Sequence, residues 1–175
     1  MRHGLVAVII SLALAWPSTG AFAEADDQAC AGGGVSLPDD LAGWAGRSPV
    51  DAAGEASGLA RAVLAVGHGV DARLKPVGEL HYVAPPEKPG DAASYGGLFA
   101  FAVPRAGTYR VALGAGAWVD VLKDGTAIAS TAHGHRPACT GISKVVAFPL
   151  TPGRYTLQIA GNGDPVLAVM VAPAP

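Results

Sequence analysis

Short apolar runs separated by glycine, proline, asparagine and aspartate dominate this chain from residue 66 onward. The runs are rich in β-branched, aromatic and aliphatic residues, which favour strands, and the residues between them favour turns. The 24 glycines and 14 prolines among 175 residues would be typical of disorder if hydrophobic residues were scarce, but half of the chain is hydrophobic. The pattern therefore predicts many short strands joined by tight turns.

Nine runs are predicted to be strands, and no long amphipathic helix accompanies them. This spacing is typical of an antiparallel β-sandwich or jelly-roll-like fold, here a single all-β domain over residues 66–172. Asp124-Gly125 predicts a hairpin turn between two of the strands. The predicted strands are Val70–Leu74, Glu79–Val83, Leu98–Val103, Thr108–Leu113, Ala117–Leu122, Thr126–Thr131, Lys144–Leu150, Arg154–Ala160 and Val166–Val171.

Two stretches of the chain have similar sequences and are named here the echoed stretches: "FAVPRAGTYRVAL" (101–113) and "FPLTPGRYTLQI" (148–159). Each has an aromatic strand end, a proline turn, Gly-x-Tyr and then alternating apolar residues. A ligand platform is one interpretation of Gly-x-Tyr, but alternation that continues straight into a strand favours a hairpin corner. We expect Tyr109 and Tyr155 to be architectural, in two hairpins at matching places in facing sheets.

The N-terminal sequence predicts export. A basic start at Arg2 and His3, a twelve-residue apolar run and Ala21-Phe22-Ala23 have the layout of a signal peptide, residues 1–23, cleaved after Ala23. The apolar run is too short to cross a bilayer, which needs about 20 residues. We therefore expect a periplasmic or secreted protein without a transmembrane segment. Residues 24–65 are expected to form a Gly/Ala-rich arm anchored by Trp44.

Charge argues against nucleic acid as a partner. Without Arg2, 11 basic residues face 14 acidic ones, and the chain contains no basic run and few aromatic residues. Binding to nucleic acid depends on clustered positive charge. An unidentified small molecule, metal ion or protein is the expected partner.

The stretch "TAHGHRPACTG" (131–141) carries the residues best suited to chemistry. His133 and His135 point to the same side of an extended chain, where they suit zinc, copper or iron. The turn-rich surroundings equally suit histidines of an ordinary surface loop. Cys139 has one other cysteine to pair with, Cys30, and two cysteines in an exported protein usually form a disulfide.

Further metal ligands depend on how the strands are arranged. Alternation places Glu79 and His81 on one face of their predicted strand. If that strand neighbours the histidine loop, Glu79, His81, His133 and His135 form a two-His-one-carboxylate set, which suits non-haem iron. No nucleophilic elbow of the form Gly-x-Ser-x-Gly surrounds any serine.

Residues 76–171 resemble a family of small exported proteobacterial proteins that are commonly labelled homogentisate 1,2-dioxygenase. The resemblance rests on Pro-Glu-Lys-Pro, on Ala-Gly-Thr-Tyr-Arg-Val-Ala-Leu and on His-x-x-Cys-Thr-Gly-Ile-x-Lys. The label implies a cupin in which two histidines and a glutamate hold iron for opening an aromatic ring. His133 and His135 match the first cupin motif, whereas Cys139 stands where that motif has glutamate, and "RYTLQIAGN" lacks the third histidine. The paired Gly-Thr-Tyr and Gly-Arg-Tyr stretches also resemble non-catalytic bacterial pre-peptidase C-terminal domains.

Three functions therefore stay open. The first is a non-enzymatic periplasmic binding or accessory module with weak transition-metal binding at His133 and His135. The second is a cupin-like iron dioxygenase, which requires Glu79 or His81 to converge on the histidine pair. The third is a structural interaction protein that uses Trp44 and Trp118 as exposed anchors.

Overall fold

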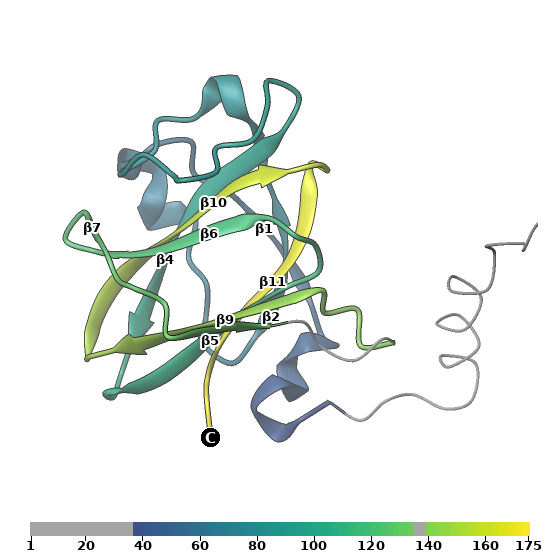
Figure 1. Ribbon diagram of the computed structural model, residues 1–175, viewed down its shortest axis with the longest axis vertical. Coiled ribbons are helices and arrows are strands. Elements are labelled where there is room, and N and C mark those ends of the chain that lie inside the picture. The colour runs from purple at the N-terminus through teal and green to yellow at the C-terminus, as the bar shows by residue number, and fades with distance from the viewer. Residues whose placement is uncertain (1–36, 135–138) are drawn as a thin grey trace, which may run out of the picture.

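The computed structural model describes residues 37–134 and 139–175, and it is a β-sandwich (Figure 1). The predicted all-β, sandwich-like single domain is confirmed. The larger sheet has the strand order β1-β2-β11-β5-β9-β8, and the smaller sheet has the order β3-β4-β10-β6-β7. The larger sheet comprises β1 (Ser48–Asp51), β2 (Gly69–Arg73), β11 (Val166–Pro173), β5 (Gly107–Leu113), β9 (Lys144–Leu150) and β8 (Ala132–Gly134). The smaller sheet comprises β3 (Lys75–Pro76), β4 (Tyr95–Val103), β10 (Gly153–Asn162), β6 (Trp118–Lys123) and β7 (Thr126–Ala127).

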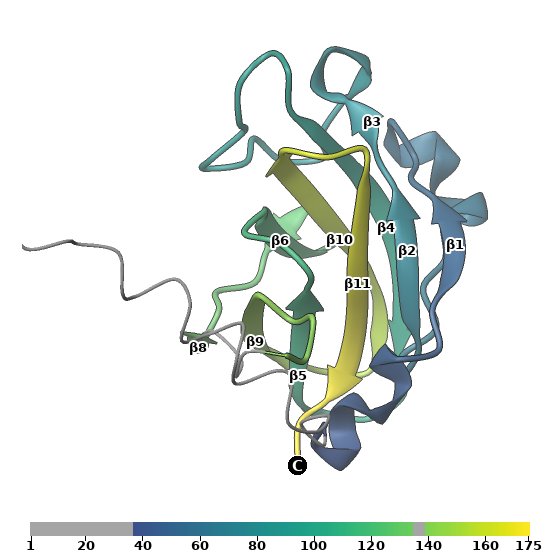
Figure 2. The same ribbon diagram turned by 90° about the vertical axis from the view of Figure 1, so that its right-hand side faces the viewer.

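All strand pairs are antiparallel except β1 with β2, which is parallel. The sheets enclose one hydrophobic core because alternate residues of their inner faces meet between the layers. Phe99, Leu157 and Ile159 from the smaller sheet and Leu113 and Val169 from the larger one are fully buried there. Figure 2 shows the two layers in a view turned by 90°.

The two echoed stretches are connections between the sheets, not hairpins within one sheet. The first links β4 of the smaller sheet to β5 of the larger one, and the second links β9 of the larger sheet to β10 of the smaller one. Because β4 pairs with β10 and β5 pairs with β9, the two connections lie opposite each other, with Tyr155 beside Phe101 and Tyr109 beside Phe148. The prediction of hairpins was therefore wrong, but both tyrosines are architectural.

The Asp124-Gly125 turn joins β6 to β7 as predicted. Asp124 and Gly125 have φ of 52° and 79°, the left-handed values that a two-residue hairpin turn of this type requires. The predicted strand Thr126–Thr131 shortens to the two residues of β7, after which the chain crosses to β8 in the larger sheet.

The predicted strand Glu79–Val83 is wrong. Residues Val77–Glu79 form a 3-10 turn, η3, and residues 80–94 form a loop over the outer face of the smaller sheet. The fully buried Gln158 of β10 holds this loop. Its Oε1 accepts from the Val83 N–H at 3.0 Å, and its Nε2 donates to the Ala84 carbonyl at 2.8 Å. Side-chain bonds from Gln158 thus replace a strand ladder.

The sandwich begins before residue 66. After β1, the chain crosses to β4, where Ala53 and Leu64 hydrogen-bond to Leu98 and Ala100. Between these contacts lies a 3-10 helix, η2 (Ala56–Arg61). The described end of the predicted arm, residues 37–65, therefore supplies one edge of the sandwich.

A second, smaller cluster packs on the larger sheet. The 3-10 helix η1 (Asp39–Trp44) lies near the C-terminal end of β11 in both views (Figures 1 and 2). Leu41 and Trp44 are buried there against Ile142 and Met170. With 2% of its surface exposed, Trp44 is an internal anchor, so its predicted role as an exposed anchor for a partner is wrong.

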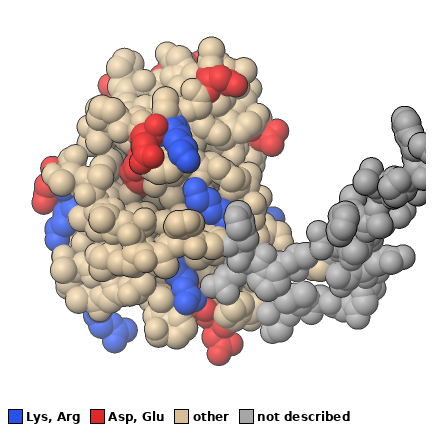
Figure 3. All heavy atoms as spheres, in the orientation of Figure 1, with Lys and Arg blue, Asp and Glu red and all other residues tan. Residues whose placement is uncertain are grey.

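Charged side chains are sparse on the face shown in Figure 3, where most of the surface is formed by other residues. Within residues 37–134 and 139–175, no helix has the length and apolar content needed to span a membrane. The predicted signal peptide 1–23, the first part of the arm, Cys30 and His135 lie outside the described residues.

Candidate functional site

A concavity lies at the edge of the sandwich that η2 closes. It is a cavity of about 960 Å³, named here the edge cavity, and its walls come from β1, η2, Lys75 of β3 and the segment around η3. The volume lies within the usual range of small-molecule sites. Its charged and imidazole-bearing lining residues are Asp51, Glu55, Arg61, Lys75, Glu79 and His81.

Backbone contacts fix the walls of the edge cavity. The His81 N–H donates to the Gly54 carbonyl at 2.8 Å, which ties the segment after η3 to the start of the η2 loop. A side chain at position 54 would be crowded, since a Cβ there would lie 3.0 Å from the Glu79 carbonyl oxygen and 3.2 Å from the Lys75 Cδ. The close approach at Gly54 thus brings η2 and β3 to opposite sides of one hollow.

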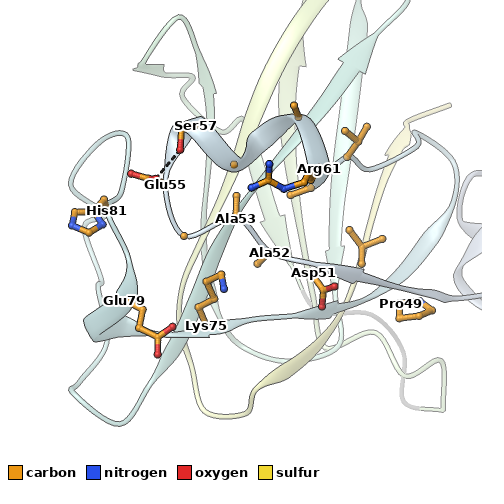
Figure 4. A pocket seen from close by; sticks show the side chains of 16 residues that line it. Pro49, Asp51, Ala52, Ala53, Glu55, Ser57, Arg61, Lys75, Glu79 and His81 are labelled. Atoms are coloured by element: carbon orange, nitrogen blue, oxygen red, sulfur yellow. Dashed lines mark hydrogen bonds between the residues drawn. The ribbon is translucent and has the colours of Figure 1, made fainter.

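The charged side chains face the hollow from several elements (Figure 4). In this view Arg61 and Lys75 lie on either side of Ala53, Asp51 lies at one end, and Glu79, Glu55 and His81 lie at the other. The Ser57 hydroxyl donates to the Glu55 carboxylate at 2.7 Å, and Asp51 forms an ion pair with Arg73 at 3.5 Å.

The remaining charges of the edge cavity are uncompensated. Among the described residues, Arg61, Lys75 and Glu79 make no ion pair and no side-chain hydrogen bond. Their charges are therefore available to a ligand with complementary groups. Sequence reasoning found Glu79 and His81 but missed Arg61 and Lys75. Arg61 reaches the cavity through the pairing of residues 53–64 with β4, and Lys75 reaches it through the pairing of β3 with β4.

A second cavity of about 630 Å³ lies at the opposite edge, between β6–β7 and β8–β9. We name it the tryptophan groove, after the partly buried Trp118 in its wall. His133, exposed on β8, also lines it. Burial and, second, the nearby Lys88 charge lower the pKa of the Lys144 ammonium in the same groove.

The four predicted metal ligands are thus divided. Glu79 and His81 line the edge cavity, His133 lines the tryptophan groove, and His135 lies outside the described residues. No three His, Cys, Asp or Glu side chains of the described part of the chain lie together in a way that would hold a metal ion. Glu79 and His81 both line the edge cavity, but Glu79 ends the η3 turn and His81 lies in the loop after it, so strand alternation does not account for their proximity.

Cys139 does not carry a free thiol. Its expected partner, Cys30, lies outside the described residues, so the Cys30–Cys139 pairing stays a prediction. Cys139 also has φ of 75°, a left-handed backbone that is uncommon for residues other than glycine.

No protein-family model and no curated protein matches this chain. The resemblance to the proteins labelled homogentisate 1,2-dioxygenase, and to pre-peptidase C-terminal domains, therefore stays a prediction that rests on the sequence stretches given above.

Proposed function

We propose that this protein is an exported, non-enzymatic β-sandwich module that binds a small charged ligand in the edge cavity. The observation that carries the proposal is the set of uncompensated charges of both signs, Arg61, Lys75 and Glu79, in one concave wall. A few polar groups that converge on one concavity are a feature of ligand sites, because they fix the orientation and the specificity of the ligand.

The charges indicate the class of ligand. A carboxylate suits the space between Arg61 and Lys75, since guanidinium and ammonium groups bind carboxylates through charge-assisted hydrogen bonds. An ammonium group suits Glu79. A small zwitterion such as an amino acid or a dipeptide carries both groups.

Nuclear magnetic resonance titration tests this proposal, with L-glutamate, L-lysine and the dipeptide Gly-Gly as probes. We expect saturable shifts at the amides of Ala53, Gly54 and His81. Arg61→Met and Lys75→Met are each expected to weaken binding about tenfold or more, because each removes a charge-assisted bond. Arg154→Met, an exposed change on β10 outside the cavity, is the matched control.

The proposal is wrong if none of the probes shifts these amides, or if Arg61→Met and Lys75→Met bind as tightly as the control. Export is checked separately by N-terminal sequencing of protein purified from the periplasm, which is expected to begin at Glu24.

Weak transition-metal binding by His133 and His135 stays part of the proposal, supported by the exposure of His133 on β8. Metal analysis of the exported protein and of a His133→Ala, His135→Ala double variant tests it. We expect substoichiometric metal that falls further in the variant. Stoichiometric iron that the variant loses would instead support the ring-opening dioxygenase that the family label implies.

A further inference from the structure

Two lysines converge on one indole in the tryptophan groove. The Lys88 Nζ lies 5.3 Å from the centroid of the Trp118 ring, and the Lys144 Nζ lies 5.6 Å from it. Each distance is within the range of a cation–π contact. Lys88 comes from the loop over the smaller sheet and Lys144 from the start of β9 in the larger sheet.

Neither lysine has a carboxylate partner among the described residues. Within residues 37–134 and 139–175, the Lys144 ammonium donates a hydrogen bond to the Ala117 carbonyl alone, at 2.9 Å. Two like charges at one ring repel each other, and this repulsion contributes to the lowered pKa of Lys144. An anion placed between the two ammonium groups would relieve the repulsion.

Two acidic residues, Asp120 and Glu87, also line the tryptophan groove, and an anion must bind on the side of the lysines. Both carboxylate oxygens of Asp120 are occupied, one by the Trp118 Nε1–H at 3.0 Å and the other by the Gln158 Nε2–H at 3.1 Å. Glu87 is exposed at the rim. Asp120 therefore serves to orient the indole, while the lysines are left for a ligand.

The floor of the tryptophan groove is apolar. Val119, Val146 and Phe148 are inner-face residues of the two sheets, and Ile128 packs against the same core. An apolar group placed over Ile128 and the exposed edges of these side chains would leave water for carbon surface, which is favourable at about 25 cal/mol per Å² buried. The groove thus combines two lysines that have no carboxylate partner among the described residues with apolar side chains on its floor.

We propose that the tryptophan groove binds a small amphiphilic carboxylate, such as a medium-chain aliphatic acid. Its carboxylate lies between Lys88 and Lys144, and its hydrocarbon part lies over Ile128 and Phe148. The site is separate from the edge cavity and does not depend on the function proposed for that cavity.

Calorimetry and nuclear magnetic resonance with sodium octanoate test the proposal. We expect saturable binding, together with a shift of the Trp118 indole signal, which a Trp118→Phe variant assigns. Lys88→Met and Lys144→Met are each expected to weaken octanoate binding about tenfold or more. Octanol and acetate, which each lack one half of the ligand, are expected to bind much more weakly than octanoate.

Two controls keep the experiment decisive. Lys75→Met, in the edge cavity, is expected to leave octanoate binding unchanged, so failure at one site is distinguishable from failure at the other. Lys88 is exposed, so its replacement is expected to leave the fold intact even if Lys144→Met is destabilised. No saturable octanoate binding up to about 10 mM, octanol binding as tight as octanoate binding, or unchanged affinity in Lys88→Met would each overturn the proposal.

Discussion

Tyr109 and Tyr155 make the same contact at the two connections between the sheets. The Tyr109 hydroxyl donates to the Arg105 carbonyl at 3.0 Å, and the Tyr155 hydroxyl donates to the Thr151 carbonyl at 2.8 Å. In both cases the acceptor lies four residues upstream, on the turn itself. Both rings are buried, so each hydroxyl fixes a turn to the core while its own polarity is satisfied.

Removing these hydroxyls is expected to destabilise the fold unequally. Tyr155→Phe loses the bond to the Thr151 carbonyl and also the bond from the Thr151 N–H at 3.0 Å, whereas Tyr109→Phe loses one bond. We expect the free energy of unfolding to fall by about 2 kcal/mol for Tyr155→Phe and about 1 kcal/mol for Tyr109→Phe, measured by urea denaturation. Tyr95→Phe, whose hydroxyl has no bond among the described residues, is the control and should change stability by less than about 0.5 kcal/mol. Equal effects for all three variants would contradict this interpretation.

The ionisation of Lys144 is expected to respond to Lys88. Burial is the larger cause of its lowered pKa, and the Lys88 charge is the second. Both causes disfavour the ammonium form in the folded protein, so Lys144 should lose its proton at lower pH than an ordinary lysine. In Lys88→Met the pKa of Lys144 should rise but stay below the ordinary value, because burial persists. A titration of the Lys144 side chain by nuclear magnetic resonance measures both values, and a fall in the variant would contradict the assigned cause.

The side chain of Gln158 holds the loop of residues 80–94 on the smaller sheet. Gln158 of β10 is completely buried beneath residues 80–94 and bonds to the backbone of Val83 and Ala84. A backbone N–H or carbonyl group that is buried without a hydrogen-bond partner lowers the free energy of unfolding. The loop also carries Lys88, so Gln158 indirectly positions one wall of the tryptophan groove.

Gln158→Met keeps the size of this side chain and removes its hydrogen bonds. We expect the free energy of unfolding to fall by about 2–3 kcal/mol, because the Val83 N–H and the Ala84 carbonyl lose their partner. Amide exchange at Val83 and Ala84 should become faster than in the unchanged protein. Thr156→Val on the same strand is the control, since the Thr156 hydroxyl has no bond among the described residues. Unchanged exchange at Val83 would show that the loop is held by other contacts.

At the scale of whole elements, the alternation of apolar and polar residues predicts strands well where the two faces of a sheet have different surroundings, as in β5 and β10. It fails at Glu79–Val83, because hydrogen bonds from the distant Gln158 satisfy that backbone and no neighbouring strand does. It also misses β1, whose four residues include Pro49 and only one partly buried apolar side chain, Val50. A parallel edge strand of this length is too short to show an alternation of apolar and polar residues in the sequence.

At the scale of the molecule, the sequence predicts the sandwich but only fragments of its cavities. Glu79 and His81 are near each other along the chain, so local spacing is enough to place them in one cavity. Arg61 joins them through contacts between distant segments, as do Lys88 and Lys144 at Trp118. Such convergence depends on which strands pair across the sheets, and local periodicity carries no information about that pairing.

The N-terminal segment has its own attachment to the sandwich, apart from any disulfide. Leu41 and Trp44 of η1 are buried on the larger sheet, Arg47 lies over the Trp44 ring, and Asp40 forms an ion pair with Arg110. These contacts hold η1 in place through packing. A bond between Cys30 and Cys139 would therefore act mainly on the unfolded chain, by restricting the freedom of the segment it closes.

Breaking the predicted Cys30–Cys139 disulfide should consequently lower stability without undocking η1. The bond would close a loop of about 110 residues, for which the chain-entropy treatment gives a loss of about 5 kcal/mol in the free energy of unfolding on reduction. The Trp44 indole signal of the folded protein should stay in its native position, because the groups that bury Trp44 are untouched. Urea denaturation with and without reductant measures the loss, and the Cys30→Ala, Cys139→Ala double variant should be insensitive to reductant. A stability that reductant leaves unchanged in the unmodified protein would show that the two cysteines are not joined, whereas loss of the native Trp44 signal would show that packing alone does not hold η1.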